Sequence, residues 1–257
     1  MSSELAEVER KELDQEVRDR GLIAPPRHMA IFVAIFVALG VAGTVLQVHL
    51  HTQPSNKMPM PGGLASHKSV VPLYLSLIVS EWALLFFVWR GIRTKGIKLR
   101  DLIGGSWTSG KRISADLLLG AGIWLAFLFA VVIPAGLIAG GQSTHPHPVN
   151  PMFPHTVFEA TLWVMVSINA GFCEEVAFRG YLQRQFRVLT GKSFPAVLLQ
   201  AIVFGFGHAY EGLGGAVAAG IYGLLFGLVA WWRKSLRPGM VAHAWSDIFF
   251  VLLAKVV

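Results

Sequence analysis

The sequence predicts an all-α fold, a polytopic bundle of about seven transmembrane helices. Of the 257 residues, 54% are hydrophobic and only 14% are charged, whereas a soluble domain carries about 25% charged residues. The apolar residues fall in runs of about 20, the length that a helix needs to cross the hydrocarbon core of a bilayer. Lys and Arg are distributed unevenly between the runs. Together these observations indicate an integral membrane protein.

The apolar runs divide the chain into seven spans. They cover residues 29–50, 70–90, 115–139, 157–178, 195–210, 214–232 and 238–256. We assign the first three spans to an N-terminal region, 29–140, and the last four to a catalytic core, 157–257. Residues 1–28 are rich in charged side chains and form a polar lead-in. This segment is no secretory signal, because such a signal needs a short apolar core directly after a basic start.

The basic residues predict the orientation of the spans. Arg179 apart, 18 Lys and Arg residues lie in the lead-in and in every second loop, and three lie in the alternate segments. Basic segments stay in the cytoplasm, so we expect a cytoplasmic N-terminus and a C-terminus outside. The same flanking positions account for the net charge of +7. The expected partner is therefore the lipid bilayer, and no nucleic acid.

The polar residues of the fourth span are concentrated near its end. Glu174 and Glu175 are adjacent, and Arg179 lies four residues after the second. Residues four apart share a helix face, so we expect Glu175 and Arg179 to form a structural pair. Glu174 points about 100° away and lacks that partner. An ionisable group at this depth is costly and usually faces a bundle interior or a water-filled cavity, which makes Glu174 a candidate functional residue.

Two later spans add polar residues at hydrocarbon depth. His208 lies near the end of the fifth span, and the seventh span carries His243 and Asp247, four residues apart. If the fourth and fifth spans form an antiparallel hairpin with a turn near Gly191, Glu174 and His208 are level. The convergence of these four groups predicts an active site within the bilayer, nearer its cytoplasmic side.

Three kinds of chemistry fit these groups. Glutamate and histidine can act as general bases on water, and protonated imidazole or carboxyl groups can stabilise an oxyanion. Alternatively, two histidines, a carboxylate and a water can hold zinc, and the ligands would then be Glu174, His208 and His243. No span carries the i, i+4 histidine pair on which helical zinc sites are commonly built. We therefore expect no cofactor, with zinc as the alternative.

Two further residues lie in the spans. Glu81 is midway along the second span and is expected to be a structural acid, hydrogen-bonded within the bundle, with a proton relay as the alternative. Cys173 is the only cysteine. Nothing beside it in the sequence would favour the thiolate, so we expect a buried, inert thiol rather than a nucleophile.

Three motifs in this order resemble those of the CPBP family of intramembrane proteases, which includes CAAX prenyl endopeptidases and bacterial Abi-type proteins. Glu-Glu-x-x-x-Arg matches residues 174–179, Phe-x-x-x-His matches residues 204–208, and His-x-x-x-Asn/Asp matches residues 243–247. Each motif is weak alone, and together they are specific. The resemblance covers about residues 160–250, and the first three spans carry no matching motif.

The resemblance implies an intramembrane endopeptidase whose substrate is a membrane protein or a lipidated peptide. Glu174 with His208 would activate the attacking water, and His243 with Asp247 would stabilise the oxyanion. The family has been called both metal-dependent and glutamate-type. Where the last motif position is asparagine, its amide can donate a hydrogen bond to an oxyanion. Asp247 can donate such a bond only when its carboxyl group is protonated. The expected location is a bacterial plasma membrane.

Two other function classes compete with this hypothesis. A non-catalytic immunity or scaffold protein could keep the fold, but the intact set of Glu174, His208 and His243 favours the enzyme. A small proton-coupled transporter could use the same acids, but no inverted repeat of the kind that marks many transporters is apparent.

Overall fold

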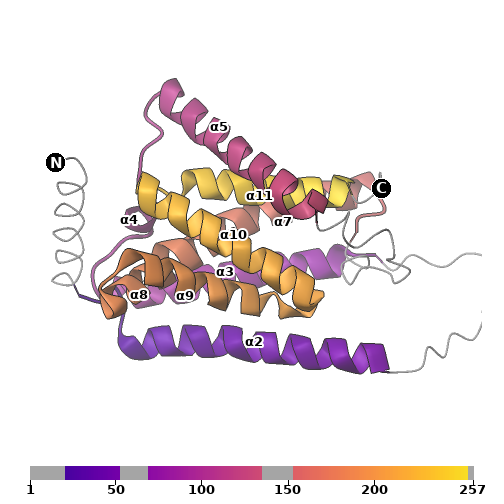
Figure 1. Cartoon of the computed structure of the whole chain (residues 1–257), viewed down its shortest axis with the longest axis horizontal. Helices are drawn as coiled ribbons and strands as arrows, with labels where there is room; N and C mark the ends of the chain where they lie inside the picture. The colour runs from indigo at the N-terminus through magenta and orange to yellow at the C-terminus, as the bar shows by residue number, and fades with distance from the viewer. Residues whose placement is uncertain (1–20, 53–68, 135–152, 254–257) are drawn as a thin grey trace, which may run out of the picture.

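The computed structural model describes residues 21–52, 69–134 and 153–253 (Figure 1). Within these ranges the chain forms helices and no strand, which confirms the all-α fold class. Every predicted span corresponds to a long helix. These are α2 (Pro26–Thr52), α3 (Val71–Arg93), α5 (Gly110–Phe127), α7 (Val157–Glu174), α9 (Ser193–Gly207), α10 (Gly212–Arg233) and α11 (Arg237–Leu253). Residues 1–20 of the lead-in and the predicted span ends at 135–139 and 254–256 lie outside the described residues.

Two helix boundaries differ from the predicted ones. The third long helix begins at Gly110, five residues earlier than expected. The helix of the fourth span does not end near residue 178, but continues as a π-helical segment, η3 (Glu175–Leu182), and as α8 (Gln183–Thr190). It ends where Gly191 adopts a left-handed conformation with φ 63°, which glycine adopts without steric cost. Apolar content marks where a helix leaves the hydrocarbon, not where the helix itself ends.

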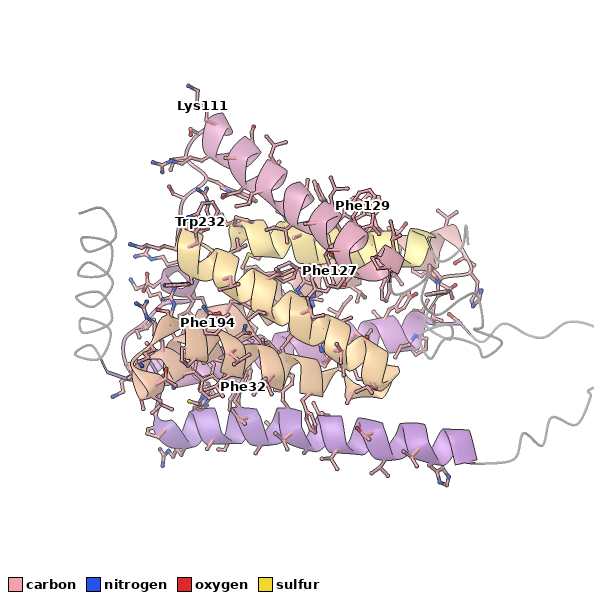
Figure 2. All side chains as sticks on the ribbon, in the orientation of Figure 1. Phe32, Lys111, Phe127, Phe129, Phe194 and Trp232 are labelled. Atoms are coloured by element: carbon pink, nitrogen blue, oxygen red, sulfur yellow. The ribbon has the colours of Figure 1, made fainter. Side chains whose placement is uncertain are left out.

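The outer surface of the bundle is apolar, as a surface facing lipid tails must be. Figure 2 shows Phe129, Phe194 and Trp232 on this surface, and their exposed fractions are 65%, 55% and 68%. In contrast, Phe32 and Phe127 are buried between helices. Four helices (α2, α3, α5 and α10) are long and apolar enough to cross a membrane, and α9 is a shorter apolar helix. A soluble protein rarely exposes so much contiguous apolar surface.

The basic segments gather at one end of the bundle, on the left of Figure 1. There Gln185 of α8 accepts a hydrogen bond from Ile23 N–H and donates one to the Ala24 carbonyl. Arg184 donates to the last carbonyls of the short helix α4 (Leu99–Ile103). Leu236 N–H donates to the Ile103 carbonyl. These contacts join four segments that the loop charges assign to one side of the membrane.

The orientation of this basic end can be tested by cysteine accessibility. We expect a membrane-impermeant thiol reagent to label Lys95→Cys only from the cytoplasm and His145→Cys only from outside. The native Cys173 is buried, so the introduced thiol should account for the labelling. Position 145 lies outside the described residues. The reverse labelling pattern would contradict the predicted orientation.

Tight contacts between helices fix α7 against α11 and α2 against α9. A Cβ at Gly171 of α7 would lie 2.8 Å from the Met240 carbonyl oxygen of α11. A Cβ at Gly40 of α2 would overlap Phe206 of α9, and one at Gly43 would lie 2.9 Å from Tyr210. Small residues allow such approaches between helices in a membrane. They hold the elements that carry the candidate site in place.

Candidate active site

The two adjacent glutamates lie where the fourth span changes its helical geometry. Glu174 is the last residue of α7, and Glu175 is the first residue of η3. All eight residues of η3 are buried. Single π-helical turns inside α-helices often mark functional sites. Here the turn directs the two glutamates toward α11.

Glu175 and Arg179 form the expected pair. Arg179 Nη1 lies 2.9 Å from Glu175 Oε1, and both side chains are fully buried. Despite this distance, the Arg179 N–H groups have no well-aligned acceptor among the described residues. The guanidinium instead lies over the ring of Phe204, 4.2 Å from its centroid, and 5.4 Å from that of Phe226. Charge and aromatic faces therefore stabilise the cation, which gives the phenylalanine of the Phe-x-x-x-His motif a physical role.

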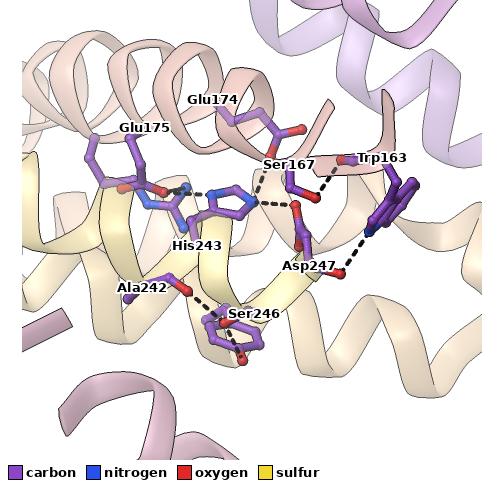
Figure 3. A network of polar contacts seen from close by, with 10 residues as sticks. Trp163, Ser167, Glu174, Glu175, Ala242, His243, Ser246 and Asp247 are labelled. Carbon is purple, nitrogen blue, oxygen red and sulfur yellow. Dashed lines mark hydrogen bonds and ion pairs between the residues drawn. The ribbon is translucent and has the colours of Figure 1, made fainter. Parts of the chain in front are cut away.

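His243 is at the centre of the polar network that Figure 3 shows. Its Nδ1 lies 3.2 Å from Glu175 Oε1. On the other side of the ring, its Nε2 lies 3.6 Å from Glu174 Oε2 and 3.8 Å from Asp247 Oδ2. The side chains of His243 and Glu174 are 10% and 15% exposed, whereas that of Asp247 is 33% exposed. The network is therefore buried on the Glu175 side and open on the Asp247 side.

The hydrogen-bond partners of His243 determine where its protons lie. Glu175 is paired with Arg179 and accepts only, so Nδ1 of His243 carries a hydrogen. Nε2 then faces Glu174 and Asp247, two further acids. A neutral Nε2 would present a lone pair to both carboxylates, so the buried network requires at least one additional proton among these three groups.

His208 approaches the site from a different direction. It follows α9 at the start of the turn Ala209–Glu211, and its Nδ1 lies 2.9 Å from the Phe204 carbonyl oxygen. A carbonyl only accepts, so Nδ1 carries the hydrogen and Nε2 keeps its lone pair. The rings of Phe204 and Tyr210 flank it.

The structure brings Glu174, Asp247 and His243 together around the imidazole ring, but with different pairs from those that the family resemblance implies. Within the described part of the chain, His208 makes no direct contact with Glu174. His243 and Asp247 are also separated by more than a hydrogen-bond length. The closest partner of His243 is Glu175, which the sequence predicted only as a structural residue. Spacing along one helix predicted the Glu175–Arg179 pair, but it could not predict the rotations of different helices about their axes.

Two contacts of the site were not predicted from the sequence. Glu81 on α3, which packs on α7, lies close enough to Glu174 for the two carboxyl groups to interact electrostatically; the sequence predicted a structural acid there, with a proton relay as the alternative. Trp163 Nε1–H donates to the backbone carbonyl of Asp247 at 3.0 Å. An isolated acid in the second span could have indicated the interaction of Glu81, because such residues are rare in membrane helices. No sequence pattern indicated the hydrogen bond of Trp163.

The predicted zinc ligands are not arranged as a metal site. In the described ranges, no group of three or more His, Cys, Asp or Glu side chains is gathered closely enough to hold an ion. Glu174 and His243 meet at 3.6 Å, but His208 stands apart from both. Cys173 is buried in the hydrophobic core, as expected for a structural thiol.

Comparison with known proteins finds one family model that matches the region containing this site. Residues 156–249 match the family described as type II CAAX prenyl endopeptidase Rce1-like. The matched region includes α7 to α11, and so all four candidate residues, and it leaves the first three spans uncovered. Neither the curated proteins nor the solved structures include a match to this chain. The match confirms the resemblance to CAAX-type membrane proteases that the three motifs indicated.

Proposed function

We propose, because residues 156–249 carry the Rce1-like CAAX-protease region, that this chain is an intramembrane endopeptidase that hydrolyses a peptide bond of a membrane-associated substrate. The observation that supports it best is the 3.6 Å contact between Glu174 Oε2 and His243 Nε2 inside the helix bundle. Burying an acid and an imidazole within a bilayer costs free energy, so residues of this kind usually have a function. The substrate class is a membrane protein or a lipidated peptide.

In the proposed reaction, Glu174 and His208 activate water. The Nε2 lone pair of His208 and a Glu174 oxygen can each accept a hydrogen bond from a water molecule placed between them. As the water oxygen attacks the peptide carbonyl carbon, its proton passes to Glu174.

His243 and Asp247 would stabilise the tetrahedral intermediate. Protonated Nε2 of His243 can donate to the oxyanion, and Asp247 can add a second hydrogen bond when it is protonated. Glu175 holds the His243 ring in position through Nδ1. The C–N bond then breaks, and the proton on Glu174 passes to the leaving amine, which returns the site to its starting state.

The proposal is tested by incubating purified protein with a prenylated CAAX peptide, with its unprenylated form and with a transmembrane peptide. We expect cleavage of at least one membrane-bound peptide at a single bond, identified by mass spectrometry. The control is Glu174→Gln, prepared in the same way. Cleavage that persists in Glu174→Gln would indicate a contaminating protease. If no peptide is cleaved, while the purified chain is folded, a non-catalytic scaffold or immunity protein becomes the better explanation.

Metal removal separates the glutamate mechanism from the zinc alternative. Because His208 does not meet Glu174 and His243 as a ligand set, we expect activity to survive exhaustive chelation. We also expect the purified protein to contain far less than one equivalent of zinc. Stoichiometric zinc, with activity lost on its removal and restored on its return, would overturn this expectation.

We also propose that the protein lies in a bacterial plasma membrane, with the basic end of the bundle in the cytoplasm. The loop charges support this orientation. It places the proposed active site closer to the cytoplasmic side, which a lipid-anchored cytoplasmic substrate could reach.

A further inference from the structure

Helix α3 ends beside an open hollow at the basic end of the bundle. The hollow has a volume of about 360 Å³, which is typical of sites for small ligands, and the described residues that line it are Trp89, Arg90, Arg93 and Thr94. These residues share one face of the helix, because positions three or four apart are neighbours on a helix surface. The intervening Gly91 and Ile92 are buried. The hollow therefore opens on the outer side of α3, and none of its residues belongs to the network around His243.

The two arginines of the hollow have no counter-ion among the described residues. The side chains of Arg90 and Arg93 are exposed, and neither takes part in an ion pair within the described ranges. Asp101 and Asp116, the described acids at this end of the bundle, lie beside other arginines. The hollow is therefore positively charged and favours an anion.

Trp89 joins this charge to the apolar part of α3. The guanidinium of Arg93 lies over the Trp89 ring, 5.0 Å from its centroid. The Phe86 ring lies 5.5 Å from that of Trp89, and Phe86 and Trp82 are 56% and 54% exposed. Tryptophan is typical of the level where hydrocarbon meets water. One face of α3 thus changes from apolar rings to arginine charge in the order in which a phospholipid changes from acyl chain to phosphate.

We propose that this hollow binds the phosphate of an anionic phospholipid. The guanidinium groups of Arg90 and Arg93 donate paired N–H groups to the phosphate oxygens. Trp89 packs against the glycerol, and the acyl chains follow the outer face of α3 past Phe86. The Thr94 hydroxyl already donates to the Gly91 carbonyl, so it borders the site without donating to the phosphate. The inference is independent of the proposed function and of which leaflet faces the basic end.

Two other occupants share part of this chemistry. Inorganic phosphate offers the same oxygens, but it has no apolar part to match the exposed rings of α3. Residues 1–20 contain seven Asp and Glu against four Lys and Arg, so the lead-in could also pair with the arginines. The phospholipid matches both the charge and the rings, and the other two are outcomes that the experiment distinguishes.

The test is native mass spectrometry of purified, delipidated protein, with phosphatidylglycerol or phosphatidylcholine added at the same concentration. Wild type should bind phosphatidylglycerol more tightly. The double variant Arg90→Gln with Arg93→Gln should bind it about 10- to 30-fold more weakly, the loss expected for two basic residues at an anionic headgroup, with phosphatidylcholine binding unchanged. The matched control, Lys111→Gln with Arg112→Gln, removes the same charge from the exposed start of α5. It should keep its affinity for phosphatidylglycerol within about threefold.

A charge-conserving variant provides a second measurement, which also decides if the glutamine variant does not fold. Arg90→Lys with Arg93→Lys keeps both charges but not the planar, paired donors, and should bind phosphatidylglycerol about three- to tenfold more weakly. Added phosphatidylglycerol should also raise the unfolding temperature of wild type and of the α5 control more than that of either arginine variant.

Three results would overturn the inference. Equal losses in the α3 and α5 glutamine pairs would indicate a general effect of surface charge. Displacement of phosphatidylglycerol by inorganic phosphate at a similar concentration would indicate a simple anion site. If wild type shows no preference for phosphatidylglycerol, but the triple variant Glu4→Gln, Glu7→Gln, Glu9→Gln does, the lead-in occupies the hollow.

Discussion

Glu174→Gln is expected to lower turnover about 10²- to 10⁴-fold, the usual contribution of a general base, while leaving the fold intact. Glutamine has almost the same shape as glutamate but cannot take a proton from water. Glu174 is not the counter-ion of a buried arginine, and it faces His243 and two further acids, Glu81 and Asp247. Removing its charge therefore relieves repulsion and should not reduce stability.

The measurement combines peptide cleavage with a thermal unfolding curve of the detergent-solubilised protein. Glu174→Gln should elute at the wild-type volume and unfold at the wild-type temperature or above it. If the variant keeps full activity, Glu174 is not the base. If it is inactive because it does not fold, its assigned role has to be exchanged with that of Glu175.

Glu175→Gln is the same chemical change one residue further along, but we expect it to lower the stability of the protein. It leaves the fully buried Arg179 without its counter-charge. Breaking a buried ion pair by removing one partner costs about 3–5 kcal/mol, and we expect the lower end because the amide oxygen can still accept a hydrogen bond. The variant should show a lower unfolding temperature or reduced expression.

Glu175→Gln should also reduce activity in the protein that does fold, because Glu175 holds Nδ1 of His243. The double variant Glu175→Gln with Arg179→Met tests the origin of the stability loss. If the unpaired cation is responsible, the double variant should be more stable than Glu175→Gln alone. A single variant that is fully stable would contradict the structural role of the pair.

Several features of this protein followed from local sequence patterns. The seven long helices could be predicted because an apolar run of about 20 residues is long enough to form a membrane-spanning helix, whichever helices pack beside it. The Glu175–Arg179 pair could be predicted because a spacing of four residues fixes a shared face within one helix. The candidate residues could be chosen because polar groups at that depth are rare and costly.

Other features depended on contacts between helices that are distant in the sequence. The extension of the fourth span through the π-helical segment to Thr190 occurs outside any apolar pattern. The tight contacts at Gly40 and Gly171 depend on which helices are neighbours. Hydropathy does not identify these neighbours, because a helix face that packs against lipid and one that packs against another helix are equally apolar.

The sequence by itself determined the fold class, the positions of the seven long helices, the candidate polar residues and the distribution of charge between the loops. All of these depend on composition or on spacing within one helix. Only the tertiary structure decided that His243 contacts Glu175 and Glu174, and that the Nδ1 atom of His208 bonds to the Phe204 carbonyl and not to Glu174. The physical reason is that the rotation of each helix about its axis is set by packing against its neighbours, and a rotation of one residue position, about 100°, changes which side chains can meet.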